Sequence, residues 1–285
     1  MKVLLKIVEI IVALAMFASV VAFIAERIEE IKNREAKFFH KPYGIYERFV
    51  KRPLDCFLSC GALIVLSPVL LFISIMGIIK LKGNPFFTQD RPGRIDPNTG
   101  KERIFKLIKF RTMSNEKDSE GNLLPDEKRL SPYGKALRAS SCDELGELFN
   151  IIKGDMSIVG PRPQLVRDMV FMTTKQRKRH TVRQGLTGLA QCNGRNGLSW
   201  ENKLRYDIEY IENGITFIGD VKIILRTVEK VLKKEGITED NMATAADYGD
   251  YLLSCNKITR EHYDEKQIEA IKFSEKLQTS CVRSS

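Results

Sequence analysis

The sequence predicts a mostly helical α+β protein that is attached to a membrane. Two long uncharged runs, Ile10–Ala25 and Cys56–Ile79, lie near the N-terminus and are long enough to enter a bilayer. A turn-rich segment at 84–113 predicts a small β-hairpin, and most of the remaining chain has the apolar spacing of helices. We expect four regions: a membrane helix with a charged linker (1–40), a membrane segment with basic flanks (41–83), a folded domain (84–240) and a polar, marginally ordered tail (241–285).

The composition excludes several classes of protein. With 43% hydrophobic and 29% charged residues, the chain is not wholly disordered, collagen-like or built only of membrane spans. The formal net charge of +10 predicts an anionic partner, which is nucleic acid, phospholipid headgroups or a phosphorylated substrate. The six cysteines form no C-x-x-C pair, so their spacing indicates scattered reduced thiols rather than a metal site.

The first apolar run has two interpretations. A helix from Val3 to Ala25 would be about 35 Å long, which is enough to cross a bilayer. A cleaved signal peptide is the alternative, because Val20-Val21-Ala22 is an acceptable cleavage site. Basic residues are denser after this run than before it, so the positive-inside rule places the rest of the chain in the cytoplasm.

The second apolar run is interrupted at its midpoint by Ser67 and Pro68. Proline removes a helical hydrogen bond, and serine can bind the freed backbone. Basic residues flank the run at both ends: Lys51, Arg52, Lys80 and Lys82. A helix–break–helix that enters and leaves on one membrane face satisfies both flanks, and a proline-kinked span is the alternative. The residues alone favour the two equally.

The folded domain begins with the predicted hairpin, whose second strand has a basic edge that includes Lys109. After a polar loop, 131–138 predicts a short helix that carries Arg138. A better-defined helix is predicted to begin at 140–144, where Ser141 and Glu144 have the spacing of a capping box, and to end at Gly154.

Asp143 would lie in the first turn of that helix, beside free N–H groups and the positive end of the dipole. One interpretation is an ordinary acidic first turn. The other is a functional site, because the adjacent carboxylates of Asp143 and Glu144 can hold Mg²⁺ and a helix N-terminus receives phosphate well.

Three further segments carry candidate anion-binding groups. Gly160-Pro161-Arg162-Pro163 is a rigid turn that presents one arginine for a bidentate phosphate contact. The segment 175–183 is dense in basic residues and ends with Arg183, and 185–197 is a glycine-rich loop with Arg195 that suits close approach to a nucleotide. Residues 220–236 predict a basic amphipathic helix, which packs in the core or lies on a membrane surface.

Several motifs occur together and in order: KRPLD at 51–55, KFRTM at 109–113, SSCDELGELFNIIKGDMSIVGPRP at 140–163 and GLTGLAQCNGRN at 185–196. With them the chain resembles the bacterial sugar transferase family, the monotopic phosphoglycosyl transferases that act on polyprenyl phosphate. The resemblance extends from about Arg48 to about Gly236. It is nearest to the small initiating transferases that make lipid-linked diacetylbacillosamine.

This resemblance implies a mechanism. Asp143, beside Glu144, would attack the β-phosphate of a UDP-sugar and expel UMP, and polyprenyl (undecaprenyl) phosphate would then attack the covalent sugar-phosphoryl aspartate. It implies Mg²⁺ held at Asp143 and Glu144, and substrate phosphates held by Lys109, Arg138 and Arg162. Arg183 and Arg195 are the candidates for the nucleotide-sugar loop.

The resemblance also implies a location and partners. Ser67 and Pro68 match the break of a re-entrant membrane helix, which favours the hairpin over the span. The catalytic domain would then be cytosolic, at the inner face of a bacterial cell membrane. Membrane lipids, the UDP-sugar and polyprenyl phosphate are the expected partners, a homodimer is compatible with the family, and nucleic acid is not expected.

The sequence departs from the family pattern at two places, and one rival hypothesis for the function is considered. Gln184 occupies a position where the family usually has proline, which bears on the rigidity of the following loop. The N-terminal helix is absent from the smallest members of the family. The rival is a non-enzymatic, membrane-anchored basic module, motivated by the +10 charge and the 175–183 cluster.

Overall fold

The computed structural model describes residues 13–14, 16–22, 24–25, 40–96, 98–194, 197–233 and 247–282. The described residues of the first apolar run are helical. Most of the predicted membrane helix at 3–25 and of the charged linker lies outside the described residues, so both stay predictions.

The described chain from Tyr46 onward is mostly helical, with two small sheets. Its elements are, in order, η1 (Tyr46–Val50), α2 (Lys51–Leu81), β1 (Phe86–Ile95), β2 (Glu102–Phe110), α3 (Asp126–Arg129), α4 (Pro132–Ala139), η2 (Cys142–Gly146), α5 (Glu147–Lys153), β3 (Met156–Val159), α6 (Val166–Met169), α7 (Thr174–Arg177), η3 (Lys178–Thr181), β4 (Gln184–Thr187), α8 (Leu189–Asn193), α9 (Trp200–Glu212), α10 (Phe217–Leu232), α11 (Tyr248–Ser254) and α12 (Arg260–Val282). The predicted α+β class is confirmed.

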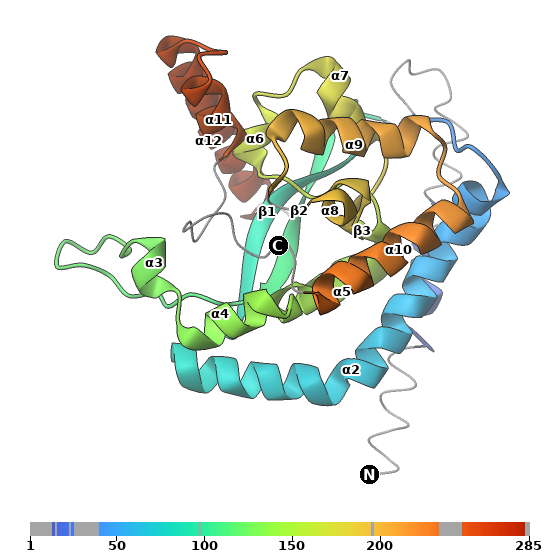
Figure 1. Ribbon diagram of the computed structural model, residues 1–285, viewed down its shortest axis with the longest axis horizontal. Coiled ribbons are helices and arrows are strands. Elements are labelled where there is room, and N and C mark those ends of the chain that lie inside the picture. The colour runs from blue at the N-terminus through green and yellow to red at the C-terminus, as the bar shows by residue number, and fades with distance from the viewer. Residues whose placement is uncertain are drawn as a thin grey trace.

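The predicted hairpin is confirmed as β1 and β2, which pair antiparallel with Phe86 opposite Phe110. The two remaining strands, β3 and β4, pair parallel with Met156 opposite Gln184. Figure 1 shows the hairpin at the centre of the molecule, with α4 and α5 at its lower end, α10 to its right, α9 above it and α2 along the lower edge.

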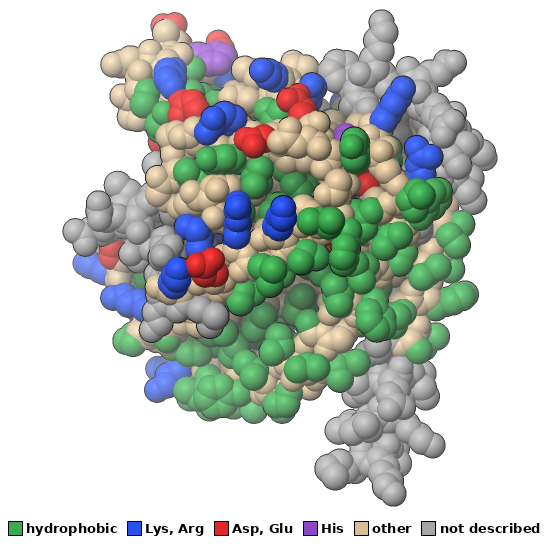
Figure 2. Space-filling view, turned by 45° about the vertical axis from the view of Figure 1, so that its right-hand side comes forward, with side chains coloured by type: hydrophobic (Ala, Val, Ile, Leu, Met, Phe, Trp, Pro, Cys, Tyr) green, Lys and Arg blue, Asp and Glu red, His purple; other side chains and the backbone are tan. Residues whose placement is uncertain are grey.

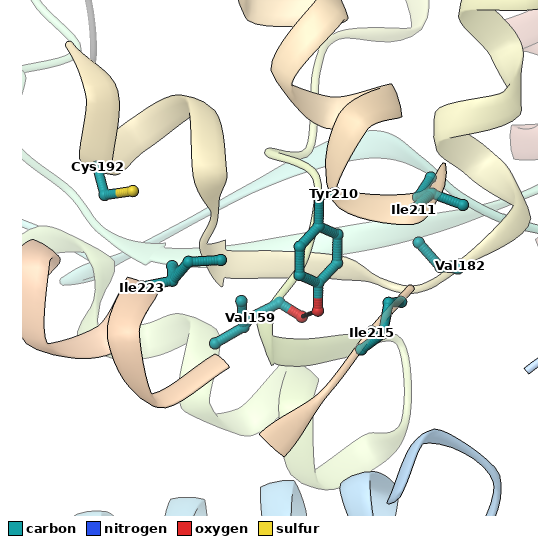
Figure 3. Close-up of a cluster of buried hydrophobic side chains, with 7 residues drawn as sticks. All are labelled: Val159, Val182, Cys192, Tyr210, Ile211, Ile215 and Ile223. Atoms are coloured by element: carbon teal, nitrogen blue, oxygen red, sulfur yellow. Dashed lines mark hydrogen bonds between the residues drawn. The ribbon is translucent and has the colours of Figure 1, made fainter. Parts of the chain in front are cut away.

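The core is divided into clusters that fix these elements together. Phe105 and Leu107 of β2 pack against Leu148 and Ile151 of α5, which places the hairpin on this helix. A second cluster joins the short sheet to α8, α9 and α10 (Figure 3), and consists of Val159, Val182, Cys192, Tyr210, Ile211, Ile215 and Ile223. In it the buried Tyr210 hydroxyl donates to Oδ1 of Asp220 at 2.8 Å and also lies 3.2 Å from the carbonyl oxygen of Val159, so this polar atom has partners among the apolar side chains.

Helix α2 exposes most of its apolar side chains. Among the described residues one helix, Tyr46–Leu81, is long and apolar enough to cross a membrane, and only 11% of its most apolar window is buried. Burying such a surface in water-free surroundings is favourable, so the exposed face indicates membrane association. Figure 2 shows the hydrophobic side chains gathered over the lower half of one face of the molecule.

Helix α2 is continuous through Ser67 and Pro68. The prediction that helical structure is interrupted there is therefore wrong. Instead the helix is bent near its middle (Figure 1). Pro68 is the one proline well inside the helix and lacks the N–H for one helical hydrogen bond, which is an established cause of such bends. The hydroxyl of Ser67 donates to the carbonyl oxygen of Ile64 at 2.8 Å and so satisfies one backbone group beside the proline.

Both ends of α2 contact the same folded body. At its start, Nζ of Lys51 lies 2.6 Å from Oδ2 of Asp220 in α10, and Oδ2 of Asp55 accepts from the Ser157 hydroxyl at 2.6 Å. At its end, Arg111 donates to the carbonyl oxygen of Leu81 at 2.9 Å. The two ends of the helix are therefore fixed to the domain, and its middle is exposed.

Two sequence predictions about local structure are wrong. The capping box predicted at Ser141 is not formed: Ser141 has a left-handed backbone (φ 55°), and its side chain makes no capping hydrogen bond. The N–H of Ser140 still donates to Ala136, so the last turn of α4 extends to this point.

The tail at 241–285 is not marginally ordered throughout, since α11 and α12 form within it. Tyr248 and Leu252, one turn apart on α11, bury against the cluster that contains Trp200.

Candidate active site

The candidate site lies where η2 and α5 meet the end of strand β2. The Nζ atom of Lys109 is 3.0 Å from Oε1 of Glu144 and 3.0 Å from Oε1 of Glu147. A guanidinium nitrogen of Arg162 lies 3.1 Å from the same oxygen of Glu144. Three segments that were predicted separately from the sequence thus meet at one place, and Glu147 joins them.

Asp143 precedes Glu144 in η2 and is partly buried. Burial and the neighbouring charge of Glu144 raise the pKa of Asp143, against the opposing charges of Lys109, Arg138 and Arg162. Asp143 lies in the first turn of η2, as the sequence predicted for the start of a helix, and the three surrounding cations favour its ionised form.

Arg138 is directed toward the site from the last turn of α4. Its Nε donates to the Thr112 hydroxyl at 3.2 Å, and Thr112 is a buried residue two positions after the end of β2. Helix α4 approaches this point so closely that a Cβ on Gly134 would lie 1.9 Å from the Thr112 carbonyl oxygen. Only glycine fits there, so the close approach that brings Arg138 to the site depends on it.

Glu147 is a residue of the candidate site that the sequence did not predict. Its side chain is almost fully buried, and burial raises the pKa of Glu147 to about 7 although the Lys109 ammonium opposes this. Burial also lowers the pKa of Lys109, but Glu144 and Glu147 more than offset this, so that pKa is raised and Lys109 stays protonated. A signal was available, because Glu147 follows Asp143 by one helical turn.

Asn150 sets the position of Lys109 relative to α5. Its side-chain oxygen accepts from the N–H of Ile108 at 2.9 Å, and its amide nitrogen donates to the carbonyl oxygen of Lys106 at 2.8 Å. The buried amide thereby takes the place of a neighbouring strand along β2. This contact fixes the strand directly before Lys109 against the helix that carries Glu147.

The structure does not bring Arg183 to the carboxylates. Its Nε donates at 3.0 Å to the carbonyl oxygen of Gly154, at the opposite end of α5 from the site. Since Gly154 follows Glu147 by seven residues, the two ends are separated by about 10 Å along the helix axis. Arg195 lies outside the described residues, so its part in a nucleotide-sugar loop stays a prediction.

Two glycines of the 185–197 loop, Gly185 and Gly188, allow close packing between backbones. A Cβ on Gly185 would lie 2.1 Å from the Gly160 nitrogen, and one on Gly188 would lie 2.1 Å from the Gly160 oxygen. At the departure from the family pattern, Gln184 is fully buried and donates to the carbonyl oxygens of Arg179 and Val182. Hydrogen bonds therefore hold the chain where a proline would restrict it.

Three cations of the basic cluster at 175–183 pair with acidic side chains of the same chain, and one of these pairs is fully buried. Arg179 is fully buried and donates to Asp207 through two nitrogens, at 2.9 and 2.7 Å. Arg177 is ion-paired with Glu102, and Lys178 lies 3.1 Å from Glu212. Arg177 and Arg179 thus bind partners within the fold, whereas the Lys178 pair is exposed, and this use of two arginines in packing argues against the rival basic binding module.

His180, in the same cluster, gives the stability of the protein a pH dependence. It is fully buried, with Nε2 3.2 Å from Arg179 and Nδ1 3.1 Å from Glu102. Burial lowers the pKa of His180 to about 4 from its ordinary value near 6.5, although Glu102 opposes this. Below pH 6.5 the unfolded chain therefore binds a proton that the folded chain does not, and stability falls as the pH decreases toward 4.

We expect His180→Gln to remove this part of the pH dependence, because glutamine can accept from Arg179 and donate to Glu102 without titrating. The thermal midpoints of both proteins should be measured between pH 7.5 and 5. The wild type should lose up to about 1.4 kcal/mol per pH unit relative to the variant below pH 6.5. Parallel curves would contradict this, and His262→Gln on exposed α12 is the matched control.

The carboxylates of the candidate site could hold a metal ion only together with the phosphate oxygens of a bound substrate. No three His, Cys, Asp or Glu side chains within the described ranges are arranged to hold a metal ion by themselves. Mg²⁺ is commonly held by one or two carboxylates and by substrate phosphates. The adjacent Asp143 and Glu144 carboxylates fit that role, and the fit concerns their chemistry rather than a finished coordination shell.

The fold and the site together define a membrane-associated protein whose carboxylate pair is surrounded by cations suited to phosphate. The chain belongs to the bacterial sugar transferase family, whose model matches residues 46–234. It is 47% identical to the uncharacterized sugar transferase EpsL of Bacillus subtilis over 198 residues, which is 69% of this chain and 94% of that protein.

Two further relatives carry more specific names. The exopolysaccharide production protein ExoY of Sinorhizobium fredii is 33% identical over 65% of this chain and 87% of its own length. The UDP-glucose:undecaprenyl-phosphate glucose-1-phosphate transferase of Klebsiella pneumoniae is 35% identical over 72% of this chain but only 45% of its own length. The resemblance to the diacetylbacillosamine type stays a prediction.

Proposed function

We propose that this protein transfers a sugar-1-phosphate from a UDP-sugar to polyprenyl (undecaprenyl) phosphate and releases UMP. The observation that carries the proposal is the contact of Glu144 with both Lys109 and Arg162, directly beside Asp143. Phosphoryl transfer needs positive groups that neutralise the phosphate oxygens, and here they surround a candidate nucleophile. The lipid acceptor fits a site whose neighbouring helix α2 exposes an apolar face.

In the first step, a carboxylate oxygen of Asp143 attacks the β-phosphorus of the UDP-sugar. The bond between that phosphorus and the bridging oxygen breaks, and UMP leaves with the oxygen. Lys109, Arg138 and Arg162 stabilise the charge on the phosphate oxygens and also favour the ionised, nucleophilic form of Asp143. The product is a sugar-phosphoryl aspartate, in which the Asp143 carboxylate and the phosphoryl group form a mixed anhydride.

In the second step, a phosphate oxygen of the polyprenyl phosphate attacks the same phosphorus. The phosphorus–aspartate bond breaks, which restores the carboxylate and yields polyprenyl-diphosphate-sugar. Splitting one transfer into two lets a single carboxylate act in turn on two different substrates. Mg²⁺, held by Asp143 or Glu144 together with the diphosphate, would supply further positive charge to the phosphate oxygens.

We also propose that α2 enters and leaves the membrane on one face. A helix that crosses a bilayer carries its ends to opposite sides of about 30 Å of hydrocarbon. Both ends of α2 instead contact one folded body, through Lys51 at its start and Leu81 at its end. The bend at Pro68 and the basic flanks support the same topology, with the domain on the cytoplasmic face of the inner membrane.

Cysteine labelling tests this topology. In a chain whose Cys142, Cys255 and Cys281 are replaced by serine, so that the remaining native thiols are the buried Cys56, Cys60 and Cys192, Arg48→Cys and Asn84→Cys each add one thiol, just before and just after α2. Both should react with a membrane-impermeant maleimide from the cytoplasmic side alone, in inverted vesicles but not in intact spheroplasts. Labelling of the two thiols from opposite sides would mean that α2 spans the bilayer.

A panel of UDP-sugars tests the function and the donor together. Purified protein should release UMP from at least one UDP-sugar when Mg²⁺ and polyprenyl phosphate are both supplied, and chelation of the metal should stop the reaction. The panel should include UDP-glucose, UDP-galactose, UDP-GalNAc and UDP-diacetylbacillosamine. Absence of UMP release from every donor, with folded protein in a lipid environment, would contradict the proposal.

A further inference from the structure

The turn that carries Arg162 is held through its carbonyl oxygens. Pro161 and Pro163 have no N–H groups, so the turn has few backbone donors of its own. The Pro161 carbonyl oxygen accepts from the N–H of Gly185 at 2.8 Å, and the next two carbonyl oxygens accept from two arginine side chains. Three successive carbonyl groups are therefore bonded to three different elements of the fold.

Arg179 supplies one of these side chains. It is fully buried in η3 and donates to the carbonyl oxygen of Arg162 from the same nitrogen that donates to Asp207. A buried guanidinium without a carboxylate partner would be very costly, and Asp207 of α9 supplies that partner. The ion pair between Asp207 and Arg179 thus orients the group that holds the backbone of Arg162.

Arg91 of β1 supplies the second arginine side chain that holds the turn. It donates to the carbonyl oxygen of Pro163 at 3.1 Å and to the side-chain oxygen of Gln89 at 2.6 Å. Burial and then the charge of Arg162 lower the pKa of Arg91 to about 10. The fold thus keeps two like charges close together, which costs free energy, and the hydrogen bonds to Pro163 and Gln89 offset part of that cost.

The side chain of Arg162 is 39% exposed and points at Glu144, whereas its backbone is fixed from behind. We propose that Arg91 and Arg179 are positioning residues, which clamp the Gly160–Pro163 turn so that the Arg162 guanidinium meets the diphosphate of the donor. This inference rests on the proposed function for the identity of the ligand. It goes beyond it in assigning a role to two arginines that do not touch the reacting atoms.

A double-mutant cycle in UDP binding tests the clamp. The dissociation constant of UDP, with Mg²⁺ present, is measured by calorimetry for the wild type, Arg91→Met, Arg162→Met and the double variant. Because an Arg162 whose backbone is released would keep only part of its charge-assisted contact with the diphosphate, we expect Arg91→Met to weaken UDP binding on the order of tenfold. In the Arg162→Met background the same change should have less than about a twofold effect.

Equal losses in the two backgrounds would overturn the inference, since a general loss of charge or of stability acts in both. Gln89→Ala, which releases Arg91 without removing it, should give a smaller loss that likewise depends on Arg162, and it serves if Arg91→Met does not fold. Arg103→Gln is the matched control, because Arg103 is exposed on the same hairpin and pairs with Asp96.

UMP release by the wild type separates this inference from the proposed function. Coupling in UDP binding without any UMP release would support the clamp and contradict the transferase. UMP release without coupling would support the transferase and contradict the clamp. A wild-type chain that neither binds UDP nor releases UMP would overturn both.

Discussion

Asp143→Asn should abolish the release of UMP from the donor sugar. We expect a loss of more than about a thousandfold, because removal of the nucleophile in covalent enzymes has cost up to about a millionfold. The sharpest measurement uses the donor in excess and omits polyprenyl phosphate, so that each enzyme can react only once. The wild type should release UMP in proportion to enzyme and hold the sugar phosphate covalently, and the variant should do neither.

The loss should not come from unfolding. Burial and the charge of Glu144 raise the pKa of Asp143, so the ionised carboxylate is disfavoured by its surroundings and a neutral amide should preserve the thermal midpoint. Asp90→Asn, at an exposed pair with Lys106 on the hairpin, is the matched control and should keep its activity. Substantial single-turnover UMP release by Asp143→Asn would contradict a nucleophilic role for this residue.

Gly185→Ala should strongly destabilise the domain. The added Cβ would lie 2.1 Å from the nitrogen of Gly160 and 2.3 Å from the carbonyl oxygen of Thr187. Both are backbone atoms that are tied into hydrogen bonds, so β3 and β4 must move apart. We expect a cost of about 3 kcal/mol or more, which lowers the thermal midpoint by roughly 6–12 °C in a domain of this size.

The fluorescence of buried Trp200 during thermal unfolding provides the measurement. Gly197→Ala is the matched control from the same glycine-rich loop, because a Cβ there meets no atom within 4 Å. It should leave the midpoint nearly unchanged. If Gly185→Ala unfolded at the same temperature as Gly197→Ala, the close backbone contact with Gly160 would not be essential to the fold.

Local patterns in the sequence predicted the elements whose stability is local. Turn residues and alternating strand residues predicted the hairpin of β1 and β2, and helical spacing with a terminal glycine predicted α5 and its end at Gly154. The capping box at Ser141 failed because the end of α4 determines the backbone there. The tail was misjudged because α11 gains its stability from contacts with Trp200 and Phe171, which are distant in sequence.

The residues of the candidate site that the sequence predicted are likewise those that can be recognised from their neighbours along the chain. Asp143, Glu144, Lys109, Arg138 and Arg162 lie in motifs with a chemical meaning of their own, and the structure places them together. Residues that act by holding others had no such motif. Asn150 resembles an ordinary polar helix residue until the edge of β2 is seen to bond to it.

The sequence by itself determined the class of the protein: a long apolar segment, a hairpin, and a set of carboxylates and cations typical of phosphate chemistry. These features depend on neighbouring residues, so they can be read along the chain. Only the tertiary structure decided how each charge is used. Arg162 faces the site while Arg179 and Arg183 are bound inside the fold, because the burial of a guanidinium and its partner depends on segments far apart in sequence.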